Sequence, residues 1–166
     1  AARIHDLDDW NREFLALAEE ALSEDRIQHA AAYLRAAEFF MAKGDPDKAE
    51  AYERQAKLFQ DVYQNDFAAG RVRTEEVPYP GGHLPAWHLS VPEGVPSKGT
   101  IVVHGGFDSY GEELYGSMRS IPEAGYDTLL FEGPGQGGVI RRQGIPFTTQ
   151  WERPVAAVLD HFELTD

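Results

Sequence analysis

A glycine-rich segment after an apolar run is the first feature of the sequence that could carry out chemistry. Residues 104–109 read His-Gly-Gly-Phe-Asp-Ser, and they follow residues 99–103, whose β-branched, apolar centre predicts a strand buried on both faces. Glycines let the backbone approach a substrate closely, and backbone amides directed at a developing oxyanion lower a reaction barrier by roughly 3 to 4 kcal/mol per donor. The segment therefore predicts either a site for oxyanion stabilisation or an ordinary glycine turn.

A second glycine-rich segment follows the next predicted strand. Residues 131–137 read Phe-Glu-Gly-Pro-Gly-Gln-Gly, and Gly133, Gly135 and Gly138 also have the spacing of a dinucleotide-binding fingerprint. Such a fingerprint must open a helix at once, so that the helix N-terminus faces the pyrophosphate. Residues 141–146, Arg-Arg-Gln-Gly-Ile-Pro, are a poor helix start, and we predict a loop over residues 133–146. Nucleotide binding is accordingly the weakest hypothesis for this segment.

The histidines and paired glutamates do not predict a metal site or an acid–base pair. His83 and His88 are five residues apart on a predicted strand and so face opposite sides of it. Neighbouring glutamates at 75–76 and 112–113 point in different directions on a strand or helix and suit solvated surfaces. We expect His104 to hold its loop through a side-chain hydrogen bond rather than to act as a base. We expect no metal and no cofactor.

The segments that position these residues change character near residue 70. Residues 1–70 contain two Gly and one Pro, whereas residues 71–166 contain fourteen Gly and nine Pro, which predicts two domains. In the first domain, apolar residues recur at three- and four-residue steps and predict helices over residues 10–22, 27–43 and 46–69. The helical pair joined near Gly44 also resembles one unit of a tetratricopeptide array, which suggests a partner-binding module as an alternative.

In the second domain the apolar period changes to two. Alternation predicts strands over residues 71–77 and 84–90, followed by strands at residues 99–103 and 126–131 and helices at residues 112–124 and 148–164. Strands that alternate with helices predict a parallel sheet and an α/β fold. Two such crossover strands are too few for a complete doubly wound domain, so we expect a truncated C-terminal end.

The composition excludes several classes of protein. With 15 Lys and Arg against 28 Asp and Glu, the formal charge is −13, which would repel nucleic acid. The absence of cysteine excludes disulfide scaffolds, thiolate metal sites and cysteine nucleophiles. The longest apolar runs are far shorter than a membrane span, and we expect a cytoplasmic protein without membrane partners.

The two glycine-rich segments, together with residues 80–87, 112–115 and 151–152, resemble one branch of the α/β-hydrolases. This branch has a helical N-terminal cap and includes 2,6-dihydroxypseudooxynicotine hydrolase, the fermentation/respiration switch protein group and fungal polyketide-shortening hydrolases. The resemblance runs from about residue 30 onward. It implies that residues 1–70 form a helical cap segment and that residues 71–166 form the N-terminal part of the hydrolase core.

The chain departs from this branch in a respect that decides the mechanism. None of its serines lies in a Gly-x-Ser-x-Gly elbow: Ser23, Ser90, Ser97, Ser109, Ser117 and Ser120. The branch places its elbow after the helix that ends this chain, and its acid and histidine later still. The resemblance therefore implies a triad beyond Asp166, and these residues alone are expected to be inactive. Glu132 also stands where the branch often has Asp.

The resemblance implies the N-terminal portion of a serine hydrolase that cleaves an ester, amide or carbon–carbon bond of a carbonyl-containing small molecule through an acyl-enzyme. The amides of Gly106 or Phe107 would join one from the elbow to bind the oxyanion, and Asp108 and Tyr110 would contact the substrate. The partners would be the remainder of the hydrolase domain and, by analogy, a second copy in a homodimer. The alternative is a non-catalytic helical-hairpin interaction module on a truncated α/β scaffold.

Overall fold

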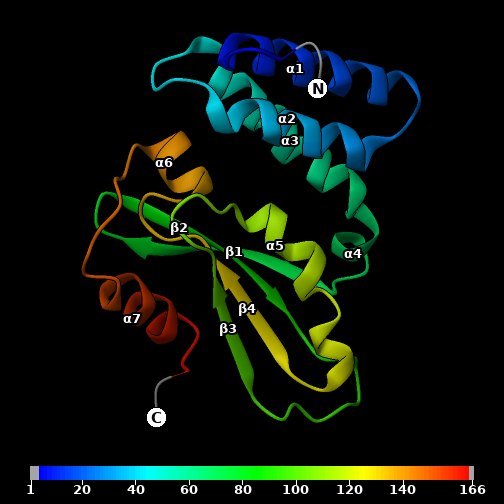
Figure 1. Ribbon diagram of the computed structural model, residues 1–166. Coiled ribbons are helices and arrows are strands. Elements are labelled where there is room, and N and C mark those ends of the chain that lie inside the picture. The colour runs from blue at the N-terminus through cyan, green and yellow to red at the C-terminus, as the bar shows by residue number, and fades with distance from the viewer. Residues whose placement is uncertain (1–3, 165–166) are drawn as a thin grey trace. The chain divides into compact units, whose positions relative to one another are not determined.

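The protein, seen here in a computed structural model that describes residues 4–164, forms two compact units (Figure 1). The boundary lies between Asn65 and Asp66, whereas the composition changes near residue 70. The first unit holds helices α1 (Leu7–Ser23), α2 (Ile27–Phe40) and α3 (Pro46–Val62), as the apolar periodicity predicts. The short helix α4 (Gln64–Ala68) spans the boundary. The assignment of the helical segment as a cap stays a prediction.

Local sequence sets the ends of these helices. The Asp45 side chain caps α3 by accepting a hydrogen bond from the Asp47 amide at 3.0 Å. Helix α2 ends at Phe40, three residues earlier than predicted, because Met41 has extended backbone angles. The predicted third helix is interrupted at Tyr63, so α3 and α4 are separate helices.

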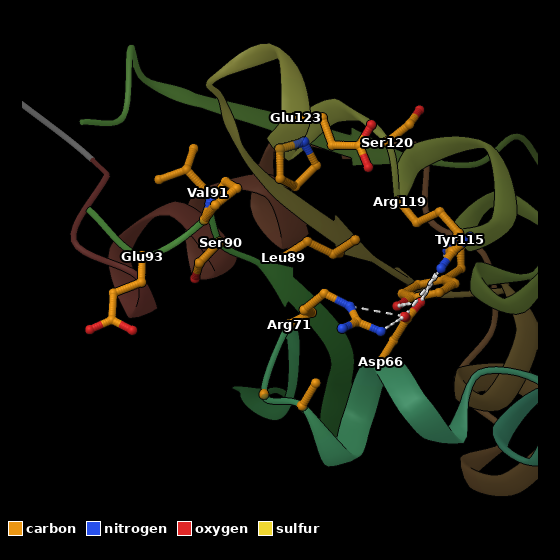
Figure 2. Close-up of a pocket in the computed structure, with 14 residues that line it drawn as sticks. Asp66, Arg71, Leu89, Ser90, Val91, Glu93, Tyr115, Arg119, Ser120 and Glu123 are labelled. Carbon is orange, nitrogen blue, oxygen red and sulfur yellow. Dashed lines mark hydrogen bonds and ion pairs between the residues drawn. The ribbon is translucent and has the colours of Figure 1, made fainter. Parts of the chain in front are cut away.

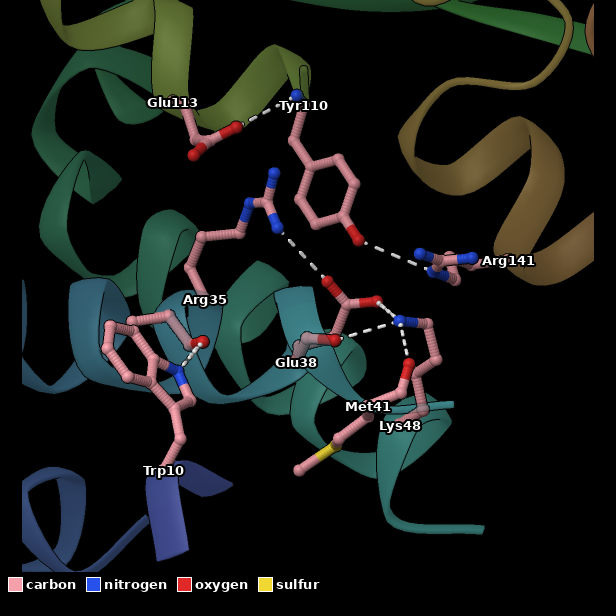
Figure 3. Close-up of polar contacts among 9 residues, drawn as sticks. Trp10, Arg35, Glu38, Met41, Lys48, Tyr110, Glu113 and Arg141 are labelled. Atoms are coloured by element: carbon pink, nitrogen blue, oxygen red, sulfur yellow. Dashed lines mark hydrogen bonds and ion pairs between the residues drawn. The ribbon is translucent and has the colours of Figure 1, made fainter. Parts of the chain in front are cut away.

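A buried ion pair joins α2 to α3 (Figure 3). The Glu38 side chain is 1% exposed, and Lys48 Nζ lies 3.1 Å from its Oε1. The same ammonium donates to the backbone carbonyl oxygens of Glu38 and Met41, at 2.8 and 2.9 Å, so each of its hydrogens has an acceptor. Arg35 Nη1 lies 3.2 Å from the other carboxylate oxygen. These partners allow a charged residue to occupy the interface between two amphipathic helices.

The second unit is built on a sheet with the strand order β1-β2-β4-β3 in the described part of the chain (Figure 1). Strands β1 (Val72–Tyr79) and β2 (Gly82–Leu89) form an antiparallel hairpin, and β2 pairs antiparallel with β4 (Asp127–Phe131). Strand β3 (Thr100–His104) pairs parallel with β4, which confirms the predicted α/β class. Apolar side chains from the sheet and the neighbouring helices form the core: Val77, Leu84, Ala86, Leu129, Phe131, Val139 and Val158.

Strand β3 is less buried than its sequence predicts. It lies at the edge of the described sheet, and its Ile101 side chain is 38% exposed. Strand β4, which lies between β2 and β3, is buried along residues 128–131. The expectation that residues 99–103 are buried on both faces is therefore wrong for this structure, because an apolar run does not reveal whether a strand is central or at an edge.

Four helical segments flank this sheet along residues 111–161: α5 (Gly111–Met118), the 3₁₀ turn η1 (Ile121–Ala124), α6 (Gly137–Gln143) and α7 (Glu152–His161). The predicted helix over residues 112–124 is thus divided, with a 3₁₀ turn that contains Pro122. The predicted helix over residues 148–164 begins only at Glu152. None of the described helices combines the length and the apolarity that crossing a membrane requires.

The predicted loop over residues 133–146 is wrong at its centre, where α6 forms. The Glu132 carboxylate accepts a hydrogen bond from the Gly138 amide at 2.8 Å, which gives the first turn of α6 an anionic partner from outside the helix. Gly144 ends the helix with a φ of +68°, in the left-handed region that glycine adopts freely. A helix start that depends on a preceding side chain is not visible in the residues of the helix itself.

Candidate active site

The two glycine-rich segments meet at one edge of the sheet. His104 ends β3 and is paired in register with Phe131, which ends the parallel strand β4. The loops that follow, residues 105–110 (the β3–α5 loop) and residues 132–136 (the β4–α6 loop), therefore leave the sheet side by side. In α/β sheets, ligands bind outside the carboxyl ends of parallel strands, so this edge is the candidate active site.

The side chain of Gln136 links the two loops. It is 2% exposed, and its Nε2 donates hydrogen bonds to the carbonyl oxygens of Gly105 and Gly106, both at 2.7 Å. Its Oε1 accepts a hydrogen bond from the Gly133 amide at 2.8 Å. Both hydrogens and the oxygen of the carboxamide are thus engaged, which fixes the β3–α5 loop to the β4–α6 loop.

The two predicted oxyanion donors differ in their surroundings. The Gly106 amide donates a hydrogen bond to Ser109 Oγ at 3.0 Å. The Phe107 amide has no hydrogen-bond partner among residues 4–164, and the Phe107 side chain is 65% exposed. Of the pair, the Phe107 amide is therefore the one available to an acceptor that enters the site.

The two predicted substrate contacts are placed in different environments. Asp108 lies on the surface of the β3–α5 loop. Tyr110 is 3% exposed, and its hydroxyl accepts a hydrogen bond from Arg141 Nε at 3.3 Å (Figure 3). Its amide donates to Glu113 Oε2 at 3.0 Å, at the start of α5. The structure thus gives Tyr110 a role in packing α5 against α6 and leaves Asp108 accessible.

His104 holds its loop, as the sequence predicts. The Trp151 indole N–H donates to His104 Nε2 at 3.1 Å, so Nδ1 carries the proton and donates to the Gly105 carbonyl at 2.9 Å. Trp151 stacks on Phe147 with 5.4 Å between ring centroids, and Phe147 meets Phe107 edge to face at 5.3 Å. An aromatic row therefore borders the β3–α5 loop, and His104 is part of its support.

Glu132 caps two helices with one carboxylate. The side chain is 2% exposed, its Oε1 accepts from the Gly111 amide at 2.7 Å, and its Oε2 accepts from the Gly138 amide at 2.8 Å. These amides begin α5 and α6. The start of α6, where a dinucleotide fingerprint would place a pyrophosphate, is therefore occupied by the protein's own carboxylate. This contact argues against nucleotide binding. The predicted absence of a helix is no longer an argument, because α6 does form here.

A second carboxyl group lies close enough to Glu132 to influence its ionisation. Burial, and then the negative charge of Glu132, raise the pKa of Glu112 to about 8. Burial also raises the pKa of Glu132, although the amides of Gly111 and Gly138 oppose the shift. Glu112 Oε2 is buried and has no hydrogen-bond partner among the described residues. Near neutral pH this pair therefore holds a proton for much of the time.

A cavity of about 530 Å³ lies at the opposite end of the sheet, lined in part by Leu89 and Arg119 (Figure 2). There Arg71, Arg119 and the Tyr115 hydroxyl donate to Asp66 at distances of 3.0 Å. Burial opposes ionisation of Asp66, but these hydrogen bonds lower its pKa to about 2. Because Leu89 pairs with Thr128 near the start of β4, this cavity is separate from the glycine-rich loops. The guanidinium groups neutralise a buried carboxylate that anchors α4.

The sequence alone does not mark Gln136 or Glu132 as site residues. Both are polar residues in a glycine-rich turn directly after a buried strand, and that position is the one signal the sequence offers. The clusters of His, Cys, Asp and Glu that could hold a metal ion are absent from the described residues. The candidate site consists of backbone amides and of the side chains that hold them.

The chain is similar to known hydrolases, although no family model matches it. It is 35% identical to Hydrolase LUC6 of Fusarium sp over 97% of this chain and 43% of that protein. It is 34% identical to Alpha/beta hydrolase psoB of Aspergillus fumigatus over 97% of this chain and 42% of that protein. The chain thus spans less than half the length of these relatives.

Solved structures show the same fold. The structure of AbyA5 matches with a TM-score of 0.75 and 22% identity, over 96% of this chain and 44% of that one. The 2,6-dihydroxy-pseudo-oxynicotine hydrolase matches with a TM-score of 0.60 and 20% identity, over all of this chain and 48% of that one. Together with the named relatives, these matches show that the chain has the α/β-hydrolase fold and is similar, over nearly all of its length, to the branch that includes the fungal hydrolases.

Proposed function

We propose that the protein is a serine hydrolase that cleaves an ester, amide or carbon–carbon bond next to a carbonyl group of a small molecule. The observation that carries this proposal is the β3–α5 loop, which presents the Phe107 amide without a partner in the described chain at the carboxyl end of a parallel strand. The hydrolases among its relatives support a hydrolytic reaction in general. The helical unit would serve as a cap over the site.

The proposed mechanism uses an acyl-enzyme. A serine outside residues 1–166 attacks the substrate carbonyl, and the carbonyl oxygen gains a negative charge in the tetrahedral intermediate. The Phe107 N–H, together with an amide next to the serine, stabilises that charge. Collapse expels the leaving group, and water then releases the acyl group from the serine. Asp108, which is exposed on the same loop, would contact the substrate.

The first test is covalent labelling of the full-length protein that carries these residues with a fluorophosphonate, followed by peptide mass spectrometry. The expected result is one adduct on a serine outside residues 1–166, with loss of turnover of a p-nitrophenyl ester. A folded full-length protein that shows neither adduct nor turnover would overturn the proposal and favour the helical-hairpin interaction module.

The role of the Phe107 amide has its own test. Phe107→Pro removes the N–H, whereas Phe107→Ala keeps it and removes the ring. We expect the proline variant to lose about 10²-fold in kcat, the typical cost of removing an oxyanion donor, and the alanine variant to change kcat little. Equal kcat values in the two variants would assign the donor to another amide.

A further inference from the structure

We propose that Gln136 is a positioning residue, whose carboxamide orients the peptide groups of Gly105 and Gly106 and thereby the Phe107 N–H that would bind the oxyanion. This inference rests on the proposed function and deepens it. Gln136 does not touch the reacting atoms in this arrangement, because its hydrogen bonds go to the carbonyl oxygens of Gly105 and Gly106 and to the Gly133 amide.

Peptide geometry links each of these carbonyl groups to the N–H of the next residue. The carbonyl of Gly105 belongs to the same peptide plane as the Gly106 N–H, and the carbonyl of Gly106 to the same plane as the Phe107 N–H. In a planar trans peptide the N–H points away from the carbonyl oxygen. A donor that binds both carbonyl oxygens, at 2.7 Å each, therefore turns both N–H groups away from itself. The Gly106 N–H accordingly donates to Ser109 Oγ at 3.0 Å rather than toward Gln136.

The two peptide groups need such a constraint. Gly105 and Gly106 have no side chains, and glycine samples more backbone conformations than any other residue. An oxyanion site accelerates a reaction only if its donors are already oriented before charge develops. A hydrogen bond to the carbonyl of a peptide group also polarises it, which strengthens its N–H as a donor. Gln136 supplies both effects from a position that is 2% exposed.

The chemistry of the contact requires a glutamine. Its two N–H bonds go to the two carbonyl oxygens, and its oxygen accepts the Gly133 N–H, so the carboxamide cannot be reversed without losing all three bonds. A glutamate of the same length would place a carboxylate against two carbonyl oxygens. Gln136 itself is held in place because it precedes α6, whose Gly138 amide is bound by Glu132.

Gln143, the last residue of α6, provides a matched control for Gln136, which directly precedes that helix. Its Oε1 accepts from the His83 amide at 2.8 Å and its Nε2 donates to the His83 carbonyl at 2.9 Å. It thus has the same side chain and the same kind of backbone partners, but its contact is to β2 rather than to the β3–α5 loop. Gln136→Glu and Gln143→Glu in the full-length protein therefore separate positioning from general stability.

Two measurements test the proposal. The first is the amide resonance of Phe107 with selective 15N-phenylalanine labelling, which reports the orientation and hydrogen bonding of that peptide without any turnover. The second is kcat and KM for an activated ester, with the affinity for a trifluoromethyl ketone that mimics the tetrahedral intermediate. We expect Gln136→Glu to shift or broaden the Phe107 resonance. We also expect it to lower kcat by about 10²-fold, to lower the affinity for the ketone by a similar factor and to leave KM within about threefold of the wild-type value.

Each outcome decides one point. An unchanged Phe107 resonance in Gln136→Glu would overturn the positioning role, whether or not the protein is an enzyme. A shifted resonance with unchanged kcat would overturn the link to the oxyanion. A shifted resonance in Gln136→Glu, together with a wild-type protein that shows no labelling and no turnover, would retain the contact and reject the proposed function. Equal losses of kcat in Gln136→Glu and Gln143→Glu would assign the effect to stability.

Gln136→Met keeps the proposal testable if the buried carboxylate of Gln136→Glu prevents folding. Methionine has nearly the length of glutamine and no hydrogen-bond donors, so the two glycine peptides lose their partner without a buried charge. We expect Gln136→Met to give the same fall in kcat at constant KM. A Gln136→Met variant with wild-type kcat and a shifted Phe107 resonance would reject the role in catalysis.

Discussion

Buried carboxyl groups are the residues whose behaviour departs most from what their types suggest. The adjacent glutamates at 112–113 are expected on solvated faces. Glu112, however, has a buried Oε2 without a hydrogen-bond partner in the described chain, and the negative charge of Glu132 helps burial to raise its pKa. Glu132 is the acceptor for two helix N-termini. Burial converts an ordinary acid into a group that retains its proton near neutral pH.

The first prediction concerns the pH dependence of stability. Because the pKa of Glu112 is raised from 4.5 to about 8 in the folded chain, the folded state binds this proton more tightly than the unfolded state. The contribution to the free energy of unfolding is therefore full below pH 4.5 and is lost as the pH rises to about 8. Glu112→Gln should remove this loss and unfold at a higher denaturant concentration than wild type at pH 8. Urea titrations at pH 5 and pH 8 provide the measurement, and an equal pH dependence in both proteins would contradict it.

The second prediction concerns two glycines with nearly the same positive φ. Gly135 and Gly94 have φ values of +83° and +80°, but a Cβ at Gly135 would lie 2.7 Å from Phe147 Cα, whereas a Cβ at Gly94 would meet nothing within 4 Å. Each alanine variant should lose roughly 1 to 2 kcal/mol through the left-handed conformation. Gly135→Ala should lose roughly 1 to 3 kcal/mol more through the overlap. Chemical denaturation of both variants measures the difference, and equal losses would show that the β4–α6 loop can move away from Phe147.

At the scale of elements, the sequence predicts most helices and strands but not how each begins. Periodicity finds the helices of the first unit and the β1–β2 hairpin, because each depends on its own residues. It does not find α6, whose first turn depends on the carboxylate of Glu132. It also does not find the Gln136 contact, since hydrogen bonds between two loops depend on the register of β3 against β4. The sequence thus predicts the two loops of the candidate site and the supporting role of His104, but not the contacts of Gln136 and Glu132.

The third prediction concerns the contact between α2 and α3. Lys48→Met leaves the Glu38 carboxylate, 1% exposed, without its ammonium partner, which should cost about 3 kcal/mol of unfolding free energy. Arg54→Met is the matched control, because Arg54 pairs with Glu19 across α1 and α3 with side chains that are 35% and 59% exposed. This exposed pair should contribute under about 1 kcal/mol. Thermal or urea unfolding compares the variants, and a similar small loss in both would show that Arg35 alone is a sufficient partner for Glu38.

For the whole molecule, two shifted carboxyl groups act in opposite directions on stability. The pKa of Asp66 is lowered from 3.8 to about 2 by its partners, despite burial, so its contribution is present above pH 3.8 and is lost as the pH falls to about 2. Glu112 reduces stability as the pH rises above 4.5. The formal charge of −13 adds self-repulsion at neutral pH.

The fourth prediction follows from this balance. These groups together place maximal stability on the acid side, near pH 4, between the ordinary pKa values of Asp66 and Glu112, 3.8 and 4.5. In Asp66→Asn, the free energy of unfolding should fall less steeply between pH 4 and pH 2 than in wild type. Its decrease above pH 4.5 should be unchanged, since Glu112 is separate from this cluster. Unfolding free energies from pH 2 to pH 8 test both statements. If the free energy of unfolding of Asp66→Asn fell as steeply as that of wild type between pH 4 and pH 2, the loss of stability in acid would be due to other carboxylates.

The position of Trp151 gives the candidate site a built-in optical reporter. Its indole donates to His104, stacks on Phe147 and lies where a Cβ at Gly133 would come within 2.5 Å, so its surroundings are those of both glycine-rich loops. The other tryptophans are Trp10 and Trp87. Replacing these two with phenylalanine would leave Trp151 as the single tryptophan of residues 1–166, and in that stretch of the chain its fluorescence would record the arrival of a ligand at the loops before, and independently of, any bond cleavage.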